Sequence, residues 1–413
     1  MSKRIQLGVL KTFVVPTRTS EEVVEVVALR QLRPRSSGRN GWKRTWPCRE
    51  TLRRSARRWF SQRENRHHSR LPYLGGVCGC ALLLTAVVLM VSCSSSKLAS
   101  PSVQTSPRVW PPAPDEPRIV FVKSISSPQD LGRNPSVWKR IGRFLTGESG
   151  ERDALQKPFG VALDEAGNLC VTDTGNNTVC WCDFTSKEWR RCEAAGKTHF
   201  ASPVAVARRN GITYVADSEL LKVFALRQDG SVAFELSAPL QRPAGLAIAG
   251  DSLVVADSQA HAIFVFDLSG KLRFQFGKRG TAPDEFNFPT HVASDTAGHL
   301  FVTDSLNSRV QVFDAAGKFL SEIGSSGDTP GHFGRPKGVA VDSFGHIYVV
   351  DAVFDNVQVF DFTGRLLLNL GQGGTGPGEF GVPTGIAIGG DNQIYVADSY
   401  NHRVQVFKYI GPL

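Results

Sequence analysis

Six aspartates recur at nearly regular spacing and could present a ring of carboxylates. Each ends a short apolar run, and successive members lie 40 to 47 residues apart. Carboxylates gathered around one axis could bind a hard metal ion or act as general acid and base. A catalytic residue has no reason to recur six times, whereas every repeated turn needs a side-chain acceptor for its free backbone N–H groups. We therefore expect a structural role for all six: Asp173, Asp217, Asp257, Asp304, Asp351 and Asp398.

Four cysteines in one short stretch form the second set with chemical potential: Cys170, Cys180, Cys182 and Cys192. Two disulfides suit an exported domain, and four cysteines permit three pairings. A metal site is the alternative, but Cys-x-Cys within a strand is not the ligand spacing of a zinc knuckle. We expect disulfides and leave their pairing open.

Both sets lie on an internal repeat. Six prolines begin the units, each usually followed two residues later by a small residue and an alternating apolar run: Pro158, Pro203, Pro243, Pro289, Pro336 and Pro383. In each unit a second apolar run ends at the repeated aspartate. A third run follows, as at 309–313, 356–360 and 403–407, and a fourth is clear in the fifth unit at 365–370. Four short β-rich strands per unit make one antiparallel sheet. Six such sheets arranged radially bury both faces, which predicts an all-β, six-bladed β-propeller.

The ends of the repeat array predict how the ring closes. The sixth unit stops after its third strand at Lys408, while a spare strand, Ile119 to Ile125, precedes the first unit. That strand can complete the last blade and cover an otherwise unpaired edge. We therefore expect a propeller domain over 118–413, closed by an N-terminal strand.

The sixth unit carries the clearest motif, Tyr395-Val396-Ala397-Asp398-Ser399-Tyr400-Asn401-His402-Arg403-Val404, which resembles the core of an NHL repeat. The Gly-, Pro- and Phe-containing links 277–289, 324–336 and 371–383 are similar to those between the blades of NHL proteins. The resemblance covers roughly 155–410 and is strongest in units four to six. Units one and two depart from the pattern, and the second lacks the Asn and Arg of the third strand.

In the fold that this resemblance implies, the residue after each repeat proline lies at the mouth of the central channel. These residues are Phe159, Val204, Ala244, Thr290, Lys337 and Thr384. In NHL-like peptide-amidating lyases, histidines at this position bind zinc. Here there is none, and His291 lies one residue further on. Lactonase-type propellers use a carboxylate and Asn set around a metal, but no acidic residue stands at these positions.

Two interpretations of the channel mouth remain. Lys337, with His291 and Thr290 nearby, could bind an anion or a peptide terminus. The alternative is a solvated mouth without a ligand. No Ser-His-Asp or Cys-His arrangement can be read from the spacing. We expect no metal and no other cofactor; Ca²⁺ or Zn²⁺ would be present only if the protein were a metal-dependent lyase or a lactonase-type hydrolase.

Basic charge is confined to the front of the chain. The net charge is +10, yet residues 1–93 hold 18 Lys and Arg against 5 Asp and Glu, which leaves the remainder at −3. The part that can fold lacks a basic footprint, so nucleic acid is not an expected ligand. We expect residues 1–70 to be a basic extension that is disordered or precedes the true start.

Residues 71–93 are expected to be a lipoprotein signal peptide or a membrane segment. Leu74 to Val91 is an uncharged apolar run preceded by basic residues. The following Met90-Val91-Ser92-Cys93 resembles a bacterial lipobox, with Met90 in place of the usual Leu. Cys93 is then the lipidated residue, and acyl chains tether the protein to a membrane. An uncleaved apolar anchor is the alternative, and both interpretations export the rest of the chain.

Two segments separate this anchor from the first blade. Residues 94–117 are rich in Ser and Pro and are expected to be a semi-extended linker. Asn134-Pro135 can begin a helix near 135–147, with an apolar stripe opposite Lys139, Arg140 and Arg143. That helix either packs on the end of the propeller or lies on an anionic membrane or a partner.

These patterns together favour a non-enzymatic protein- or ligand-binding scaffold at a bacterial membrane surface, facing the periplasm or the cell exterior. The resemblance to NHL lipoproteins implies protein partners in the cell envelope, such as multihaem cytochromes or other surface assemblies, and a monomeric propeller. A metal-dependent lyase or lactonase-type hydrolase at the channel mouth is the competing class, and a ligand sensor is the third.

Overall fold

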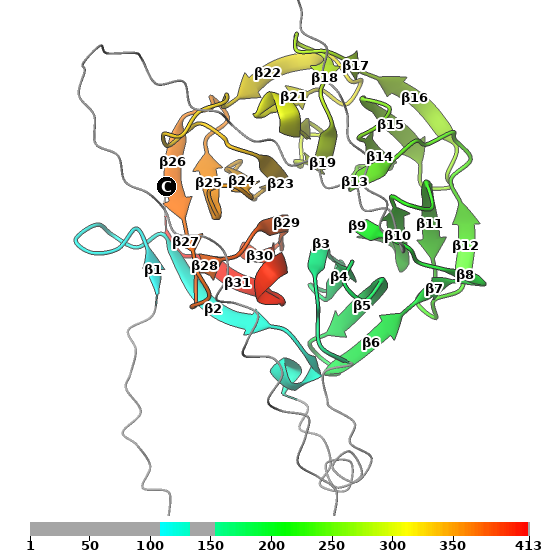
Figure 1. Ribbon diagram of the computed structural model, residues 1–413, viewed down its shortest axis with the longest axis horizontal. Coiled ribbons are helices and arrows are strands. Elements are labelled where there is room, and N and C mark those ends of the chain that lie inside the picture. The colour runs from blue at the N-terminus through cyan, green and yellow to red at the C-terminus, as the bar shows by residue number, and fades with distance from the viewer. Residues whose placement is uncertain (1–107, 133–152, 412–413) are drawn as a thin grey trace, which may run out of the picture. The chain divides into compact units, whose positions relative to one another are not determined.

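Each repeat folds into one four-stranded antiparallel sheet, and six sheets stand around a central axis (Figure 1). The computed structural model describes residues 108–132 and 153–411. The basic extension, the apolar segment with Cys93 and the helix expected near 135–147 lie outside the described residues. No helix within the described ranges is both long and apolar enough to cross a bilayer. The predicted six-bladed propeller is confirmed.

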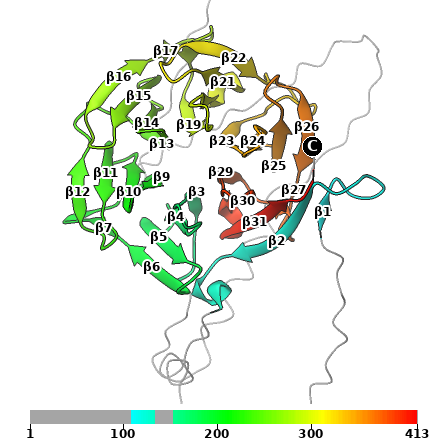
Figure 2. The ribbon, with the colours of Figure 1, turned by 180° about the vertical axis from the view of Figure 1, so that it is seen from behind.

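The blades follow the chain in order, and each runs from the central axis to the rim (Figures 1 and 2). Blades one to three comprise β3 (Pro158–Leu163), β4 (Leu169–Asp173), β5 (Thr178–Asp183) and β6 (Glu188–Cys192); β9 (Pro203–Arg209), β10 (Ile212–Asp217), β11 (Lys222–Leu226) and β12 (Val232–Glu235); and β13 (Pro243–Ala249), β14 (Ser252–Asp257), β15 (Ala262–Asp267) and β16 (Leu272–Phe276). Blades four to six comprise β19 (Pro289–Ser294), β20 (Leu300–Asp304), β21 (Arg309–Phe313) and β22 (Phe319–Ile323); β23 (Pro336–Val341), β24 (Ile347–Asp351), β25 (Asn356–Phe360) and β26 (Leu366–Leu370); and β29 (Pro383–Ile388), β30 (Gln393–Asp398), β31 (Arg403–Tyr409) and β2 (Ile119–Ile125).

Short elements join these blades. Two-residue pairs lie in the links, namely β7 (Ala194–Ala195) with β8 (Thr198–His199), β17 (Lys278–Arg279) with β18 (Glu285–Phe286), and β27 (Gln372–Gly373) with β28 (Glu379–Phe380). Single 3₁₀ turns occur at η1 (Pro128–Leu131), η3 (Ser305–Asn307) and η4 (Ser399–Asn401).

The apolar core lies between neighbouring blades rather than within any one of them. Phe301 and Val310 of blade four pack in one buried cluster with Val339 and Val349 of blade five. Both faces of a blade are therefore covered, and its strands read as continuous apolar runs instead of a strict alternation. Since one sheet alone would leave both faces in water, the blades are stable only as a ring.

The ring closes as the sequence predicts. β2 pairs antiparallel with β31 and supplies the fourth strand of the sixth blade, with a bulge between Phe121 and Lys123. The expected linker over 94–117 needs a correction, because its last part is folded onto this blade. β1 (Val109–Trp110) pairs with β2. The Trp110 ring packs edge-on against Phe407 at 5.6 Å, and this apolar contact holds residues that composition alone assigns to a linker.

Buried phenylalanines anchor the Gly-rich links between blades. Phe286, Phe333 and Phe380 are fully buried. In the second of these links, Gly324 has φ +76°, and a Cβ there would lie 2.2 Å from the Phe333 ring. Only glycine can bring the chain this close to the aromatic ring in a left-handed conformation.

We predict that Gly324→Ala lowers the free energy of unfolding by about 2–4 kcal/mol, because the methyl group would displace the buried Phe333 ring. The matched control is Gly345→Ala. Gly345 has φ +84°, but a Cβ added there would meet no atom within 4 Å, so only backbone strain of about 1 kcal/mol is expected. Chemical denaturation of both variants measures the difference. Equal losses would contradict the packing role of Gly324.

Candidate functional site

One end of the propeller collects the features that the sequence singled out. In blade four, Pro289 pairs with Asp304, and Asp304 pairs with Arg309, so the start of the first strand and the turn after the second lie at the same end. The other blades repeat this arrangement. We call this end the Asp face. It comprises the turns after the six aspartates and the links that lead into the six prolines.

The six aspartates bind backbone groups of these loops. All six are fully buried. Asp351, for example, accepts hydrogen bonds from the backbone N–H groups of Gly334 and Arg335 in the preceding link, and from Val353 and Phe354 in its own turn, at 2.7–3.2 Å. Each carboxylate thus holds a turn to the link that enters its blade, which is a structural role.

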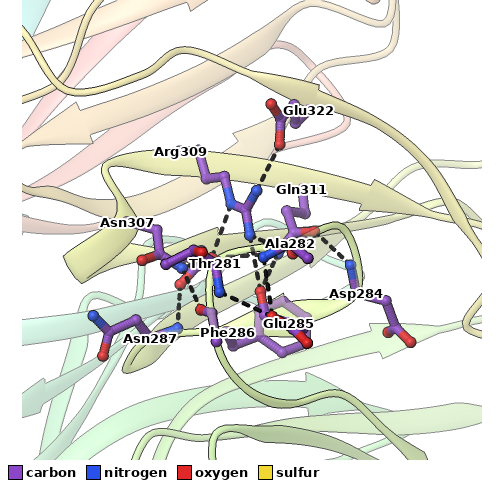
Figure 3. Close-up of polar contacts among 12 residues, drawn as sticks. Thr281, Ala282, Asp284, Glu285, Phe286, Asn287, Asn307, Arg309, Gln311 and Glu322 are labelled. Carbon is purple, nitrogen blue, oxygen red and sulfur yellow. Dashed lines mark hydrogen bonds and ion pairs between the residues drawn. The ribbon is translucent and has the colours of Figure 1, made fainter.

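In blades four and six, the Asn, Arg and Gln of the repeat reinforce the same loop. Arg309 donates to Asp304 at 3.0 Å. Figure 3 shows its other bonds, to the carbonyl oxygens of Ala282 and Glu285 and to Glu322, at 2.7–2.9 Å. Arg403 makes the equivalent bonds to Asp398 and the link of blade six. The motif residues that carry the NHL resemblance are therefore occupied in holding loops.

The channel at this face is spanned by two facing rings. Phe159 on β3 and His291 on β19 belong to blades one and four, which stand opposite each other around the axis (Figure 1). Their rings are nearly parallel, with centroids 6.3 Å apart. The mouth residues are thus not simply arranged around open water, because two of these side chains meet across the axis.

Another mouth residue is fixed by hydrogen bonds. The Thr384 hydroxyl bonds to the Phe159 carbonyl at 3.0 Å and to the Ser399 hydroxyl at 2.9 Å. This links the sixth blade to the first, so Thr384 takes part in closing the ring. Val204 and Ala244 contribute apolar groups to the half-buried inner wall.

Thr290 and His291 lie on β19, and Lys337 lies on β23, the neighbouring inner strand of blade five. The Thr290 hydroxyl and both ring nitrogens of His291 are buried and have no hydrogen-bond partner among the described residues. A buried polar group without a partner costs about 1–3 kcal/mol. Burial, with a smaller contribution from the charge of Lys337, lowers the pKa of His291 to about 3, so the imidazole is neutral at physiological pH.

Lys337 is a half-buried ammonium in positive surroundings. Burial lowers its pKa to about 8, and the charges of Arg335 and Arg242 add to the effect. Within the described ranges it forms neither a hydrogen bond nor an ion pair. Lys157, Arg242 and Arg335 directly precede the repeat prolines of blades one, three and five and are exposed. We call these three residues the basic rim.

Sequence reasoning missed an exposed apolar set on the same face. Two residues after the repeated aspartate, blades four to six carry Leu306, Val353 and Tyr400, which are 47%, 57% and 62% exposed. The signal was present in the repeat alignment, since Gly175, Glu219 and Gln259 occupy this place in blades one to three. The Lys157 ammonium lies 5.7 Å from the Tyr400 ring centroid, which joins this set to the basic rim.

The expectation of disulfides is wrong for this structure, in which all four cysteines are free thiols. Cys180 and Cys182 pack in the core between blades six and one, whereas Cys170 packs in the core between blades one and two. Cys192 lies on the Cys170 side, but β5 separates their strands. Two strand spacings are about 9–10 Å, and a disulfide spans Cα atoms only to about 7 Å.

Three of these thiols, those of Cys170, Cys180 and Cys182, are also poor nucleophiles. Burial raises the pKa of Cys180 to about 12 and raises the pKa values of Cys170 and Cys182 well above their usual range. No group of three or more His, Cys, Asp or Glu side chains within the described ranges could hold a metal ion.

Family comparisons agree with the geometry. The chain is a six-bladed propeller, and a family model described as "6-bladed beta-propeller" matches residues 291–357. It contains NHL repeats, because the NHL repeat model matches residues 155–182 and 380–407. The predicted resemblance is confirmed at the level of the repeat and the fold, but the match to unit one corrects the expectation that this unit departs from the pattern. No curated protein matches the sequence.

Many solved structures resemble this propeller at low identity. They include a streptogramin B lyase (14% identity, TM-score 0.48, 62% of this chain and 94% of that chain). A structural genomics protein of unknown function from Bacteroides thetaiotaomicron has 14% identity and a TM-score of 0.49, with 62% and 70% covered. Kuenenia stuttgartiensis hydrazine synthase has 15% identity and a TM-score of 0.45, with 61% and 95% covered. At such identities the likeness concerns the fold and not the activity.

We predict that Lys337→Met stabilises the protein at pH 7 by about 1–3 kcal/mol. The pKa of Lys337 is about 8 in the folded chain, against an ordinary value of 10.5, so the unfolded chain binds the proton more readily. The free-energy cost of burying the charged Lys337 ammonium is complete below pH 8 and fades as the pH rises from 8 to 10.5. The advantage of the variant in urea unfolding should shrink over this range.

Lys318→Met is the control, because Lys318 is exposed in the turn between β21 and β22 at the opposite end of the propeller. It should change the free energy of unfolding little at any pH. A stabilisation by Lys337→Met that does not vary with pH would contradict the burial of a charged ammonium.

Proposed function

We propose that this propeller is a non-enzymatic binding module, held at a bacterial membrane surface, that docks another protein of the cell envelope on its Asp face. The NHL repeats and the propeller fold support a binding or scaffold role in general. The observation that carries the finer proposal is the row of exposed apolar side chains on three consecutive blades. Leu306, Val353 and Tyr400 occupy one repeat position and are 47–62% exposed.

The basic rim defines the chemistry of the partner. Lys157, Arg242 and Arg335 are exposed beside this apolar row. Apolar contacts supply most of the binding free energy of an interface, while complementary charges set orientation and association rate. The partner that fits is therefore a protein surface with apolar side chains flanked by carboxylates. The proposal needs neither a metal nor an organic cofactor.

The docking proposal predicts that the triple variant Leu306→Ser, Val353→Ser, Tyr400→Ser loses its partner. The full chain would be solubilised from its native membrane in mild detergent, crosslinked and purified, and the co-purifying proteins identified. The reference chain should carry one or a few stoichiometric proteins, which the triple variant loses because its apolar contacts are gone.

A matched control comes from the opposite end of the propeller. Phe344 is 62% exposed, as is Tyr400, and lies in the turn between β23 and β24. Phe344→Ser should leave capture unchanged. Partner capture that survives the triple variant, or is lost equally in the control, would refute docking on the Asp face.

The proposed anchor makes a separate prediction. If Cys93 carries the lipid, mass spectrometry of the mature protein should find an N-terminus at Cys93 with an attached diacylglycerol, and Cys93→Ser should remove that modification. Stable anchoring follows from the burial of acyl chains in the bilayer. A mature chain that retains residues 74–91 without acylation would contradict lipidation and favour the apolar anchor.

A further inference from the structure

The junction of blades four and five leaves a set of polar atoms unsatisfied. The Thr290 hydroxyl and both ring nitrogens of His291 are buried without a hydrogen-bond partner in the described part of the chain. Buried polar atoms in folded proteins are nearly always paired, so adjacent residues that leave three such atoms unpaired require an explanation. A ligand that accepts hydrogen bonds would pair the Thr290 hydroxyl and the one N–H of the neutral imidazole, while the other ring nitrogen can only accept.

The repeat comparison shows that this junction differs from the others. His291 stands two residues after its repeat proline, where blades one, three, five and six have Gly160, Gly245, Gly338 and Gly385. A Cβ added at Gly338 would lie 2.5 Å from the Thr384 carbonyl oxygen of the next blade, and one at Gly385 would lie 2.4 Å from the Phe159 carbonyl oxygen. Blade four instead places a whole imidazole there, so blade five must leave room for it.

The positive charge of Lys337 favours a negatively charged ligand. Lys337 lies on β23, the inner strand that contacts β19, and its charge acts on the His291 imidazole. The charges that act on Lys337 itself are those of Arg335 and Arg242, and no carboxylate within the described residues pairs with it. An ammonium, a hydroxyl and a neutral imidazole N–H are all donors. A cation would be repelled here, and an apolar ligand would leave the donors unpaired.

The Phe159 ring beside these residues narrows the chemical class of the ligand further. Phe159 faces the His291 ring at 6.3 Å and supplies an apolar wall. A carboxylate has two oxygens with several lone pairs, enough to accept from all three donors while its carbon chain contacts the Phe159 ring.

From these observations we propose that Thr290, His291 and Lys337 form a carboxylate-binding site in the channel mouth, flanked by Phe159. The carboxylate comes either from a free small organic acid or from the C-terminus of a peptide chain. The inference rests on the proposed function, because the Asp face would bring a partner's chain end to this mouth.

Binding of the simplest carboxylate tests the site directly. Sodium acetate would replace sodium chloride, and separately sodium sulfate, at constant ionic strength, with the full chain in detergent. Saturable acetate-dependent shifts of the His291 side-chain NMR signals and a rise in the unfolding temperature are expected. Equal effects of chloride or sulfate would overturn the carboxylate assignment, and so would the absence of any saturable effect.

Three variants distinguish a loss of acetate binding from a loss of folding. Lys337→Met should weaken acetate binding at least tenfold, although this variant is expected to be more stable than the reference chain. His291→Gly restores the residue of four other blades and should weaken binding while the protein stays folded. Lys318→Met should leave binding unchanged. Acetate affinity that is the same in Lys337→Met and the reference chain would refute the site.

Two short peptides distinguish the sources of the carboxylate. A peptide with a free C-terminus that binds, while its C-terminally amidated form does not, assigns the site to chain ends. Acetate binding without peptide binding assigns it to small acids. Failure of both acetate and the free peptide overturns the inference.

The same measurements keep this inference apart from the proposed function. If acetate binds as expected but the Leu306, Val353 and Tyr400 variant keeps its partner, docking on the Asp face fails and the carboxylate site stands. If partner capture depends on those three residues but acetate never binds, the carboxylate site alone fails.

Discussion

The hydrogen bonds from buried aspartates to the links between blades are the constraint on which the rest of this structure depends. Each blade has two apolar faces and is stable only when both neighbours cover it. The neighbours stay in register because one fully buried carboxylate per blade accepts N–H groups from both the preceding link and its own turn, as Asp217 does with Ala201, Ser202 and Glu219. Loss of such a carboxylate would leave several buried donors unpaired, which costs more than the loss of one contact.

The regular part of the fold could be predicted from the sequence because the physical requirement repeats. A strand pattern that recurs six times is a far stronger signal than one occurrence, and β2, β21 and β25 have the predicted bounds. The four cysteines show the limit. Cys180 and Cys182, two positions apart on one strand, share one inter-blade core, but the alternation of that strand does not fix which inter-blade core Cys170 joins. That these cysteines stay unpaired therefore could not be deduced from their spacing.

Contacts across the ring were also beyond sequence reasoning. Phe159 and His291 are 132 positions apart in the chain, and nothing in either repeat indicates that the two rings meet at 6.3 Å. That contact depends on the radius of the closed ring, which all six blades set together. The apolar row of Leu306, Val353 and Tyr400 is a different case, because aligning the repeats on their aspartates would have found it, whereas its exposure required the structure.

The distribution of variable positions explains how one scaffold can be regular and specific at once. The NHL repeat model matches blades one and six, and blade four carries the same Asp, Arg and Gln as blade six at buried positions, Asp304, Arg309 and Gln311, whose side chains hold the link. Blades four to six also carry the unusual residues at exposed or channel positions. Since the buried network already fixes the loops, an exposed turn residue can change from Gln to Leu without disturbing the blade. The proposed binding features therefore lie on blades whose loops are already held by buried hydrogen bonds, so a change at an exposed position there leaves the scaffold intact.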